Sequence, residues 1–137
     1  MKIKDPSEAQ KNSVIRIEVP ALPGRELGPN ARVHWAVRNK AKVAYQYEIA
    51  SVLSKYKDLP AGLTKVWINL TFIFPTKRMR DADNLVSSFK GGLDLLVSRG
   101  ILVDDNLENV RIGEVLAIKD KARAPMTIIE IQEVKDV

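Results

Sequence analysis

Two pairs of carboxylates in the chain have the residue types and the spacing of a metal site. Asp81 and Asp83 lie one residue apart, where an apolar strand pattern ends and a helical pattern begins, and Asp104 and Asp105 follow one helix-sized segment later. A strand, a helix and a return loop could bring Asp81, Asp83 and Asp105 to one point. Carboxylates ~4 Å apart repel each other by about 4 kcal/mol per pair at a surface-like dielectric, unless a cation lies among them. Ligands that are all oxygen favour Mg²⁺, with Mn²⁺ as the alternative.

The same residues also allow a purely structural interpretation, in which Asp81 or Asp83 caps a helix and Asp104 and Asp105 form a polar turn. The rest of the composition leaves few other catalytic groups. The chain has no cysteine and a single histidine, His34, which excludes thiolate zinc sites and argues against a Ser-His-Asp triad. Carboxylates are therefore the main candidates for hydrolytic chemistry.

The bulk composition indicates one domain with a sizeable core, since 45% of 137 residues are hydrophobic and 28% are charged. No apolar run approaches the ~18 residues of a membrane span. Residues 1–12 are polar and charged, so we expect a flexible tail, no secretory signal and a cytoplasmic protein. A net charge of +5 fits a polyanionic partner.

Hydrophobic periodicity predicts an α+β domain of order β-α-β-α-β-β, with a mixed sheet packed against two helices. Strands are expected at 13–19, 65–74, 110–118 and 125–134, and helices at 38–57 and 83–99. The first helix is expected to bury a stripe of Val43, Tyr47, Ala50 and Leu53, widened by Ile49, Val52 and Tyr56. In the second helix, Gly91 and Gly92 indicate a kink or close approach by another backbone, in this chain or a second subunit. A change of apolar phase at Gly113 predicts a β-bulge.

Cationic and aromatic side chains gather in the long loop expected at 21–37, at the start of the next helix, and before the first carboxylate pair. They are Arg32, His34, Trp35, Arg38, Lys40, Lys42, Lys77 and Arg78. Such a set could bind DNA phosphates while Trp35 stacks on a base. The competing interpretation is that Trp35 packs on the core and the cations form a solvated face.

With these motifs the chain resembles the RusA family of Holliday-junction resolvases. The resemblance rests on Arg80-Asp81-Ala82-Asp83-Asn84-Leu85, on Lys90 with Asp94 and Leu96, on Gly100-Ile101-Leu102-Val103-Asp104-Asp105, and upstream on residues 28–35. It covers nearly all of residues 13–134, and a RusA-like nuclease domain is therefore expected over 13–137.

The resemblance implies a homodimeric, Mg²⁺-dependent endodeoxyribonuclease that resolves Holliday junctions by paired symmetric nicks in DNA recombination and repair. By position, Asp81, Asp83 and Asp105 correspond to the family's catalytic, metal-binding carboxylates. Arg80 and Lys90 correspond to its positive catalytic residues. The family lysine usually lies three residues after the asparagine, where this chain has Ser87, and Lys90 matches it only if three residues are inserted early in the helix.

Three other interpretations stay open at this stage. The chain could be a DNA-binding relative without catalytic activity, which the shifted lysine would favour. It could also be a metal-dependent nuclease selective for other branched DNA. The third alternative is a structural domain with a capped helix and a polar turn.

Overall fold

The computed structural model describes residues 14–76 and 82–134, with the side chains of Ala82 and Asp83 left out, so the tail expected at 1–12 lies outside the described residues. The elements run in the order β1 (Val14–Val19), η1 (Arg25–Leu27, a 3-10 turn), α1 (Trp35–Leu53), β2 (Val66–Phe74), α2 (Ala82–Ser88), α3 (Lys90–Ser98), β3 (Val110–Lys119) and β4 (Met126–Glu133). This confirms the predicted α+β class and element order, with the second helix divided in two.

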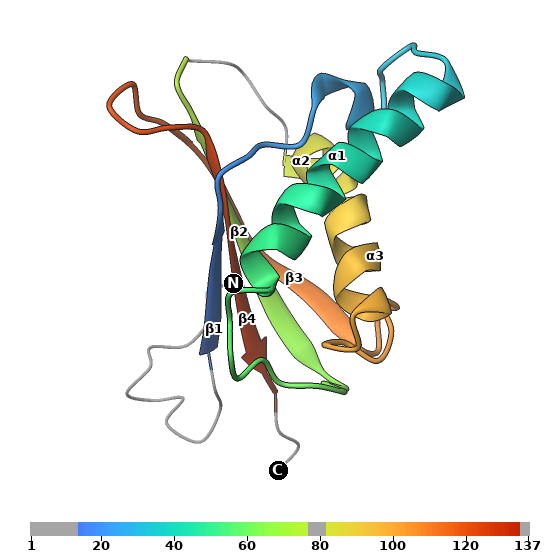
Figure 1. The fold of residues 1–137 in the computed structure, drawn as a ribbon, viewed down its shortest axis with the longest axis vertical. Coiled ribbons are helices and arrows are strands. Elements are labelled where there is room, and N and C mark those ends of the chain that lie inside the picture. The colour runs from blue at the N-terminus through green and yellow to red at the C-terminus, as the bar shows by residue number, and fades with distance from the viewer. Residues whose placement is uncertain (1–13, 77–81, 135–137) are drawn as a thin grey trace.

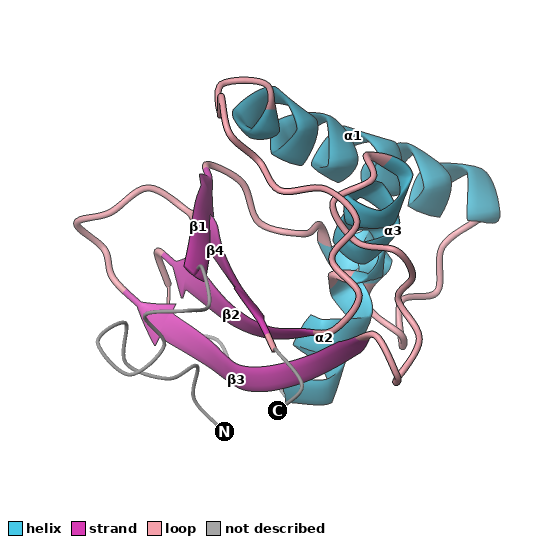
Figure 2. Cartoon of the chain, turned by 90° about the horizontal axis from the view of Figure 1, so that it is seen from below, coloured by secondary structure: helices cyan, strands magenta, loops and turns pink. Residues whose placement is uncertain are grey.

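The four strands of the described chain form one mixed sheet in the order β1-β4-β2-β3. Strands β2 and β3 are parallel, whereas β4 is antiparallel to both β1 and β2. Parallel neighbours need a crossover connection, and α2 and α3 lie in the segment that joins β2 to β3. All three α-helices lie on one face of the twisted sheet (Figures 1 and 2).

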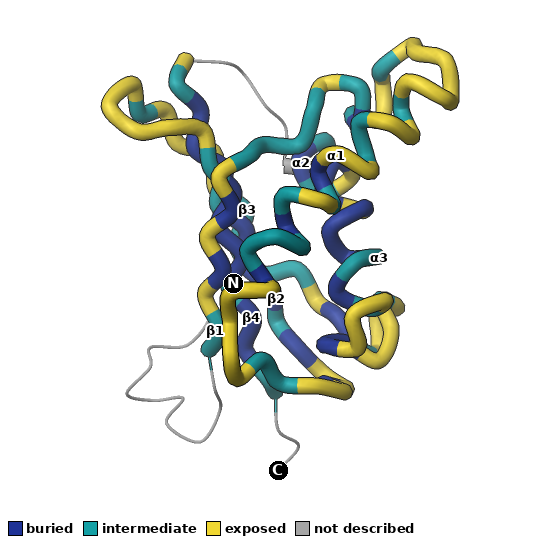
Figure 3. The backbone as a smooth tube through the Cα atoms, viewed as in Figure 1, coloured by how far each residue is buried: buried dark blue, intermediate teal, exposed yellow. Residues whose placement is uncertain are grey.

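The core lies between this face of the sheet and the helices (Figure 3). Every second residue of β2 points toward the helices and is buried, as the alternation in the sequence predicts. The fully buried side chains of this layer include Ile17, Ile68, Leu70, Phe72, Ile129 and Ile131 from the sheet, and Ile49, Phe89 and Leu96 from the helical segment.

Helix α1 begins earlier than the sequence predicts and buries only part of the predicted stripe. It starts at Trp35, because the Nδ1 atom of His34 accepts a hydrogen bond from the backbone N–H of Ala36 (3.1 Å) and caps the helix. The buried residues are Tyr45, Ile49 and Leu53, whereas Val43 and Tyr47 are 53% and 70% exposed. The predicted stripe was therefore wrong at Val43 and Tyr47, because apolar residues occur on more than one face of this helix.

The second predicted helix is broken at Phe89, which separates α2 from α3. A Cβ atom on Gly92 would lie 2.6 Å from the Phe89 ring, so this glycine makes room for that buried side chain. A Cβ atom on Gly91 would lie 3.0 Å from Cγ of Lys42, and the Gly91 carbonyl accepts a hydrogen bond from Gln46 (2.9 Å). Both glycines thus serve packing within one chain, Gly92 at the break and Gly91 against α1.

The bulge predicted at Gly113 is confirmed. Ile68 pairs with Ile112 and Leu70 with Val115, so one residue of β2 faces two residues of β3. The side chain of Asn69 accepts a hydrogen bond from the backbone N–H of Glu114 (2.8 Å), which satisfies a donor that the broken ladder would leave free. Across residues 14–76 and 82–134, no helix is long and apolar enough to cross a membrane.

Candidate active site

The ammonium group of Lys90, at the start of α3, contacts the carboxylate of Asp105, which lies in the loop between α3 and β3. It also lies 3.0 Å from a carboxylate oxygen of Asp94, one turn further along α3. The hydrogen bond to Asp105, followed by that to Asp94, raises the pKa of Lys90. The hydrogen bond from Lys90 lowers the pKa of the Asp105 carboxyl. Near neutral pH, Lys90 is therefore a fixed positive charge and Asp105 a fixed negative charge.

A second lysine, from α1, extends this arrangement. The Nζ atom of Lys42 lies 3.3 Å from the other carboxylate oxygen of Asp94. Lys42, Asp94, Lys90 and Asp105 thus alternate in charge, and we call them the charged row. The row ties α1, α3 and the loop before β3 together at the surface, where the lysine side chains are 41% and 59% exposed.

The loop that carries Asp105 is held by its neighbours. Leu102 is buried and forms a parallel bridge with Leu63, which anchors the start of the loop. Asp104 accepts hydrogen bonds from the backbone N–H of Asp105 (2.7 Å) and from the side chain of Asn106 (3.2 Å). Asp104 therefore shapes the turn, and Asp105 is the carboxylate that faces Lys90.

The remaining predicted catalytic residues are only partly within the described chain. Asp83 is the second residue of α2, and only its backbone is described; Arg80 and Asp81 lie outside the described residues. Within the described residues, no group of three or more His, Cys, Asp or Glu side chains could hold a metal ion. Of the predicted site, the structure brings together Lys90 and Asp105.

Asp105 has the chemistry that a divalent cation requires. It offers hard oxygen atoms and its side chain is 25% exposed, and the ammonium of Lys90 now takes the place beside it that a cation would occupy. Asp81 and Asp83 are the residues expected to complete an oxygen ligand set. Sequence reasoning missed the link from Asp94 to Lys42; the spacing of four between Lys90 and Asp94 was the available signal for half of the row.

The predicted DNA-binding residues have different environments. Trp35 is 72% exposed and does not pack in the core, although its ring centroid lies 5.7 Å from that of His34. The guanidinium of Arg38 donates hydrogen bonds to the carbonyl oxygens of Gly28 (3.2 Å) and Ala31 (2.9 Å), so it braces the loop.

Arg32 and Lys40 are exposed, and neither pairs with another described residue. Lys42 belongs to the charged row. Lys77 and Arg78 lie outside the described residues. Arg32, Trp35 and Lys40 are therefore the candidates with side chains available to a partner.

Comparison with known proteins adds one relative. No protein-family model matches the chain. The chain is 40% identical over 75 residues to an uncharacterized protein of Xylella fastidiosa (strain Temecula1 / ATCC 700964). The match covers 50% of this chain and 46% of that protein, so it spans about half the length of the curated relative. This similarity does not assign a family or an activity.

Proposed function

We propose that the protein is a metal-dependent endodeoxyribonuclease that resolves four-way DNA junctions. The observation that carries the proposal is the contact between Lys90 and Asp105 at the surface, between the start of α3 and the loop before β3. Phosphodiester hydrolysis at a metal needs a carboxylate that holds the cation and a positive group that balances charge on the phosphate. Lys90 and Asp105 supply one group of each kind.

The role of each residue follows from its charge. Asp81, Asp83 and Asp105 would hold Mg²⁺ or Mn²⁺, and the bound ion would activate water and stabilise the leaving oxygen. Lys90 holds its proton because its carboxylate neighbours raise its pKa, so it serves as a fixed cation beside the scissile phosphate and not as a proton acceptor. Arg80 would add a second positive charge at the same phosphate.

The proposed substrate is branched DNA. A net charge of +5 and the exposed Arg32, Trp35 and Lys40 support binding to a polyanion with unstacked bases. A four-way junction has two-fold symmetry, so a homodimer with the same symmetry would present one site to each of two equivalent strands. The reaction would then belong to DNA recombination and repair.

The direct test is cleavage of a labelled synthetic four-way junction in Mg²⁺. Wild type is expected to make paired symmetric nicks. Asp83→Asn and Asp105→Asn should bind the junction without cutting it, because each removes one negative charge with little change of shape. Asp58→Asn, the same change at an exposed residue outside the charged row, should cut like wild type.

Three results would each replace the proposal with one of its alternatives. A wild-type protein that binds the junction but never cuts it in Mg²⁺ or Mn²⁺ would be a DNA-binding relative without catalytic activity. Equal cutting of flaps, forks and three-way junctions would indicate a nuclease for branched DNA in general. A protein that binds none of these DNAs would indicate a structural domain.

A further inference from the structure

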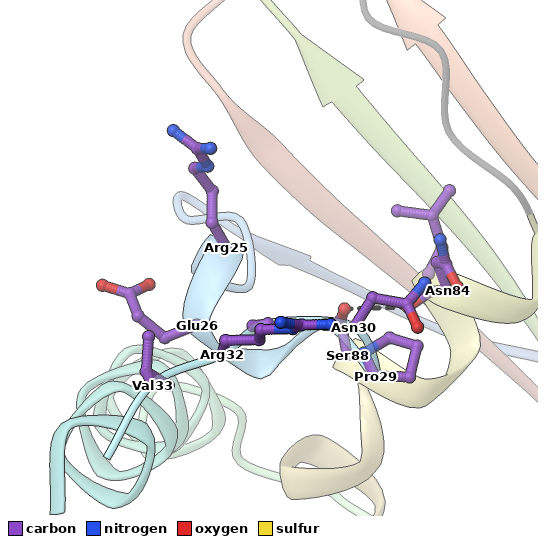
Figure 4. Close-up of a pocket in the computed structure, with 11 residues that line it drawn as sticks. Arg25, Glu26, Pro29, Asn30, Arg32, Val33, Asn84 and Ser88 are labelled. Carbon is purple, nitrogen blue, oxygen red and sulfur yellow. Dashed lines mark hydrogen bonds between the residues drawn. The ribbon is translucent and has the colours of Figure 1, made fainter.

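A cavity of about 640 Å³ lies between the loop at residues 24–33 and helix α2. This volume falls within the range of about 300–1,000 Å³ that is usual for pockets binding small organic ligands. The polar side chains of the lining come from the loop and from α2, and they are Arg25, Glu26, Asn30, Arg32, Asn84 and Ser88 (Figure 4). The charged row does not line it, so the cavity is separate from the Lys90–Asp105 contact.

The two walls of the cavity are fixed by contacts within the chain. Leu27 in the loop wall and Leu85 in the helix wall are buried in the common core. The two hydrogen bonds from Arg38 to loop carbonyls hold the loop in its curve. The hydroxyl of Ser88 donates to the carbonyl of Asn84 (2.8 Å) and fastens the other wall. The cavity is therefore formed before any ligand binds.

The polar side chains of the cavity are available to a ligand. Figure 4 shows the side chain of Arg32 extending toward the end of the cavity where Asn30, Asn84 and Ser88 lie, whereas Arg25 and Glu26 point elsewhere. Among the residues that the structure describes, none hydrogen-bonds the side-chain amide of Asn30 or Asn84, or the guanidinium of Arg32. Two amides and one guanidinium thus offer both donors and acceptors from opposite walls.

This lining suits a nucleobase better than an isolated phosphate. Side-chain amides form paired hydrogen bonds with base edges, and a guanidinium binds either a base edge or the adjoining phosphate. Pro29, at the same end of the cavity as Asn84 and Ser88, adds apolar surface for the face of a ring (Figure 4). A bare phosphate would leave the neutral amides and this apolar surface without a use.

We propose that this cavity receives one unstacked base of the DNA strand next to the scissile phosphate, with Asn30 and Asn84 reading its edge and Arg32 holding the adjoining phosphate. The proposal rests on the proposed nuclease function, because Asn84 directly follows Asp83 in α2 and so adjoins the expected metal site. Unstacking is least costly where pairing is already disturbed, as at a junction crossover. The cavity would then give the enzyme a preference for particular bases at the cut.

Two measurements test the pocket separately from the chemistry. The first is the cleavage rate on four-way junctions that vary in the bases at the crossover. The second is the fluorescence of 2-aminopurine placed in turn at each crossover position, with Ca²⁺ replacing Mg²⁺ so that binding is seen without relying on cutting. Asn30→Ala is the informative variant, and Asn39→Ala, an exposed asparagine of α1 that does not line the cavity, is the matched control.

Wild type and Asn39→Ala should cut the best junction about tenfold faster than the worst, the scale of one paired amide–base contact. Their binding should also raise the aminopurine signal at one position. Asn30→Ala should cut all junctions at similar rates and lose that signal while still binding. The aminopurine result decides whether the cavity binds a base. If wild type shows no rise in signal, or if Asn30→Ala keeps the rise, the pocket assignment is overturned even when the junction is cut. A signal that depends on Asn30 in a protein that never cuts would support the pocket and reject the nuclease.

Discussion

The Lys90 ammonium contacts the Asp105 carboxylate across fifteen residues of sequence. This contact links the start of α3 to the loop that follows it, so Lys90 reaches Asp105 although Ser87 occupies the position at which the resemblance to the RusA family implies a lysine. The break at Phe89 makes α3 a separate helix, and its direction does not have to follow that of α2. The number of residues between Asn84 and Lys90 therefore does not by itself determine where the Lys90 side chain lies.

Replacing Lys90 should reduce cutting far more than folding. Lys90→Met removes the positive charge that we propose acts on the scissile phosphate, and we expect single-turnover cleavage to fall by about 100-fold or more. The free energy of unfolding should change by less than about 1 kcal/mol, because the side chain is 59% exposed and surface ion pairs contribute little. Urea denaturation measures the second quantity. Lys90→Arg should retain part of the activity, and a Lys90→Met protein as active as wild type would remove Lys90 from the mechanism.

Asp94 should act as a positioning residue for Lys90. Its carboxylate binds both Lys42 and Lys90, and Asp94→Asn weakens both contacts without removing the catalytic charge. We expect the single-turnover rate to fall roughly tenfold, the lower end for groups that orient a catalytic residue, while the Kd for the junction stays unchanged. Asp94→Glu should restore much of the rate. A loss of DNA binding with no change in rate would show instead that Asp94 serves the binding surface.

The Asp105 carboxyl should titrate below its ordinary value of 3.8, because the Lys90 hydrogen bond favours the charged form and lowers its pKa. A carboxyl whose pKa is lower when folded stabilises the protein above its unfolded pKa and loses this contribution as the pH falls through the folded pKa. Side-chain carbon NMR of Asp105 measures the midpoint. It should move upward in Lys90→Met and stay in place in Lys40→Met, which removes an exposed lysine outside the charged row.

Two tyrosines two residues apart in α1 test which face of that helix is buried. The hydroxyl of Tyr45 is buried and donates to Thr127 (2.9 Å), and the Thr127 hydroxyl donates to the carbonyl of Ala21 (2.7 Å). Tyr45→Phe should therefore cost about 1 kcal/mol in the free energy of unfolding. Tyr47 is 70% exposed, and Tyr47→Phe should change the free energy of unfolding by less than about 0.5 kcal/mol. Equal effects in urea denaturation would contradict the observed orientation of α1.

The sequence predicts the sheet better than the helices. Alternation locates β2 within one residue and the change of phase at Gly113 locates the bulge, because both patterns follow directly from the two faces of a strand. The buried face of α1 was predicted only in part: Ile49 and Leu53 are buried as expected, but Tyr45 is buried through a hydroxyl contact that periodicity does not reveal, while the apolar Val43 faces out. The break at Phe89 was indicated only by the two glycines that follow it.

Within the candidate site, residue types and order predicted Lys90 and Asp105, but not their contact. That contact depends on how the loop after α3 folds back, which the buried Leu102 and the Asp104 turn determine. The hydrogen bonds from Arg38 to the loop could not be predicted either, because a basic residue at a helix start is expected to face solvent or a phosphate. Long-range contacts of this kind leave no periodic signal in a single sequence.

The bulge in β3 also affects the free edge of the sheet. Strand β3 lies at an edge of the sheet, where unpaired backbone groups invite another chain to add a strand. Gly113 and Glu114 divide that edge into two short runs, 110–112 and 115–119, with different registers. A straight strand from another chain could pair with only one of these two segments at a time. The extra residue therefore makes the free edge of β3 a poorer template for edge-to-edge aggregation.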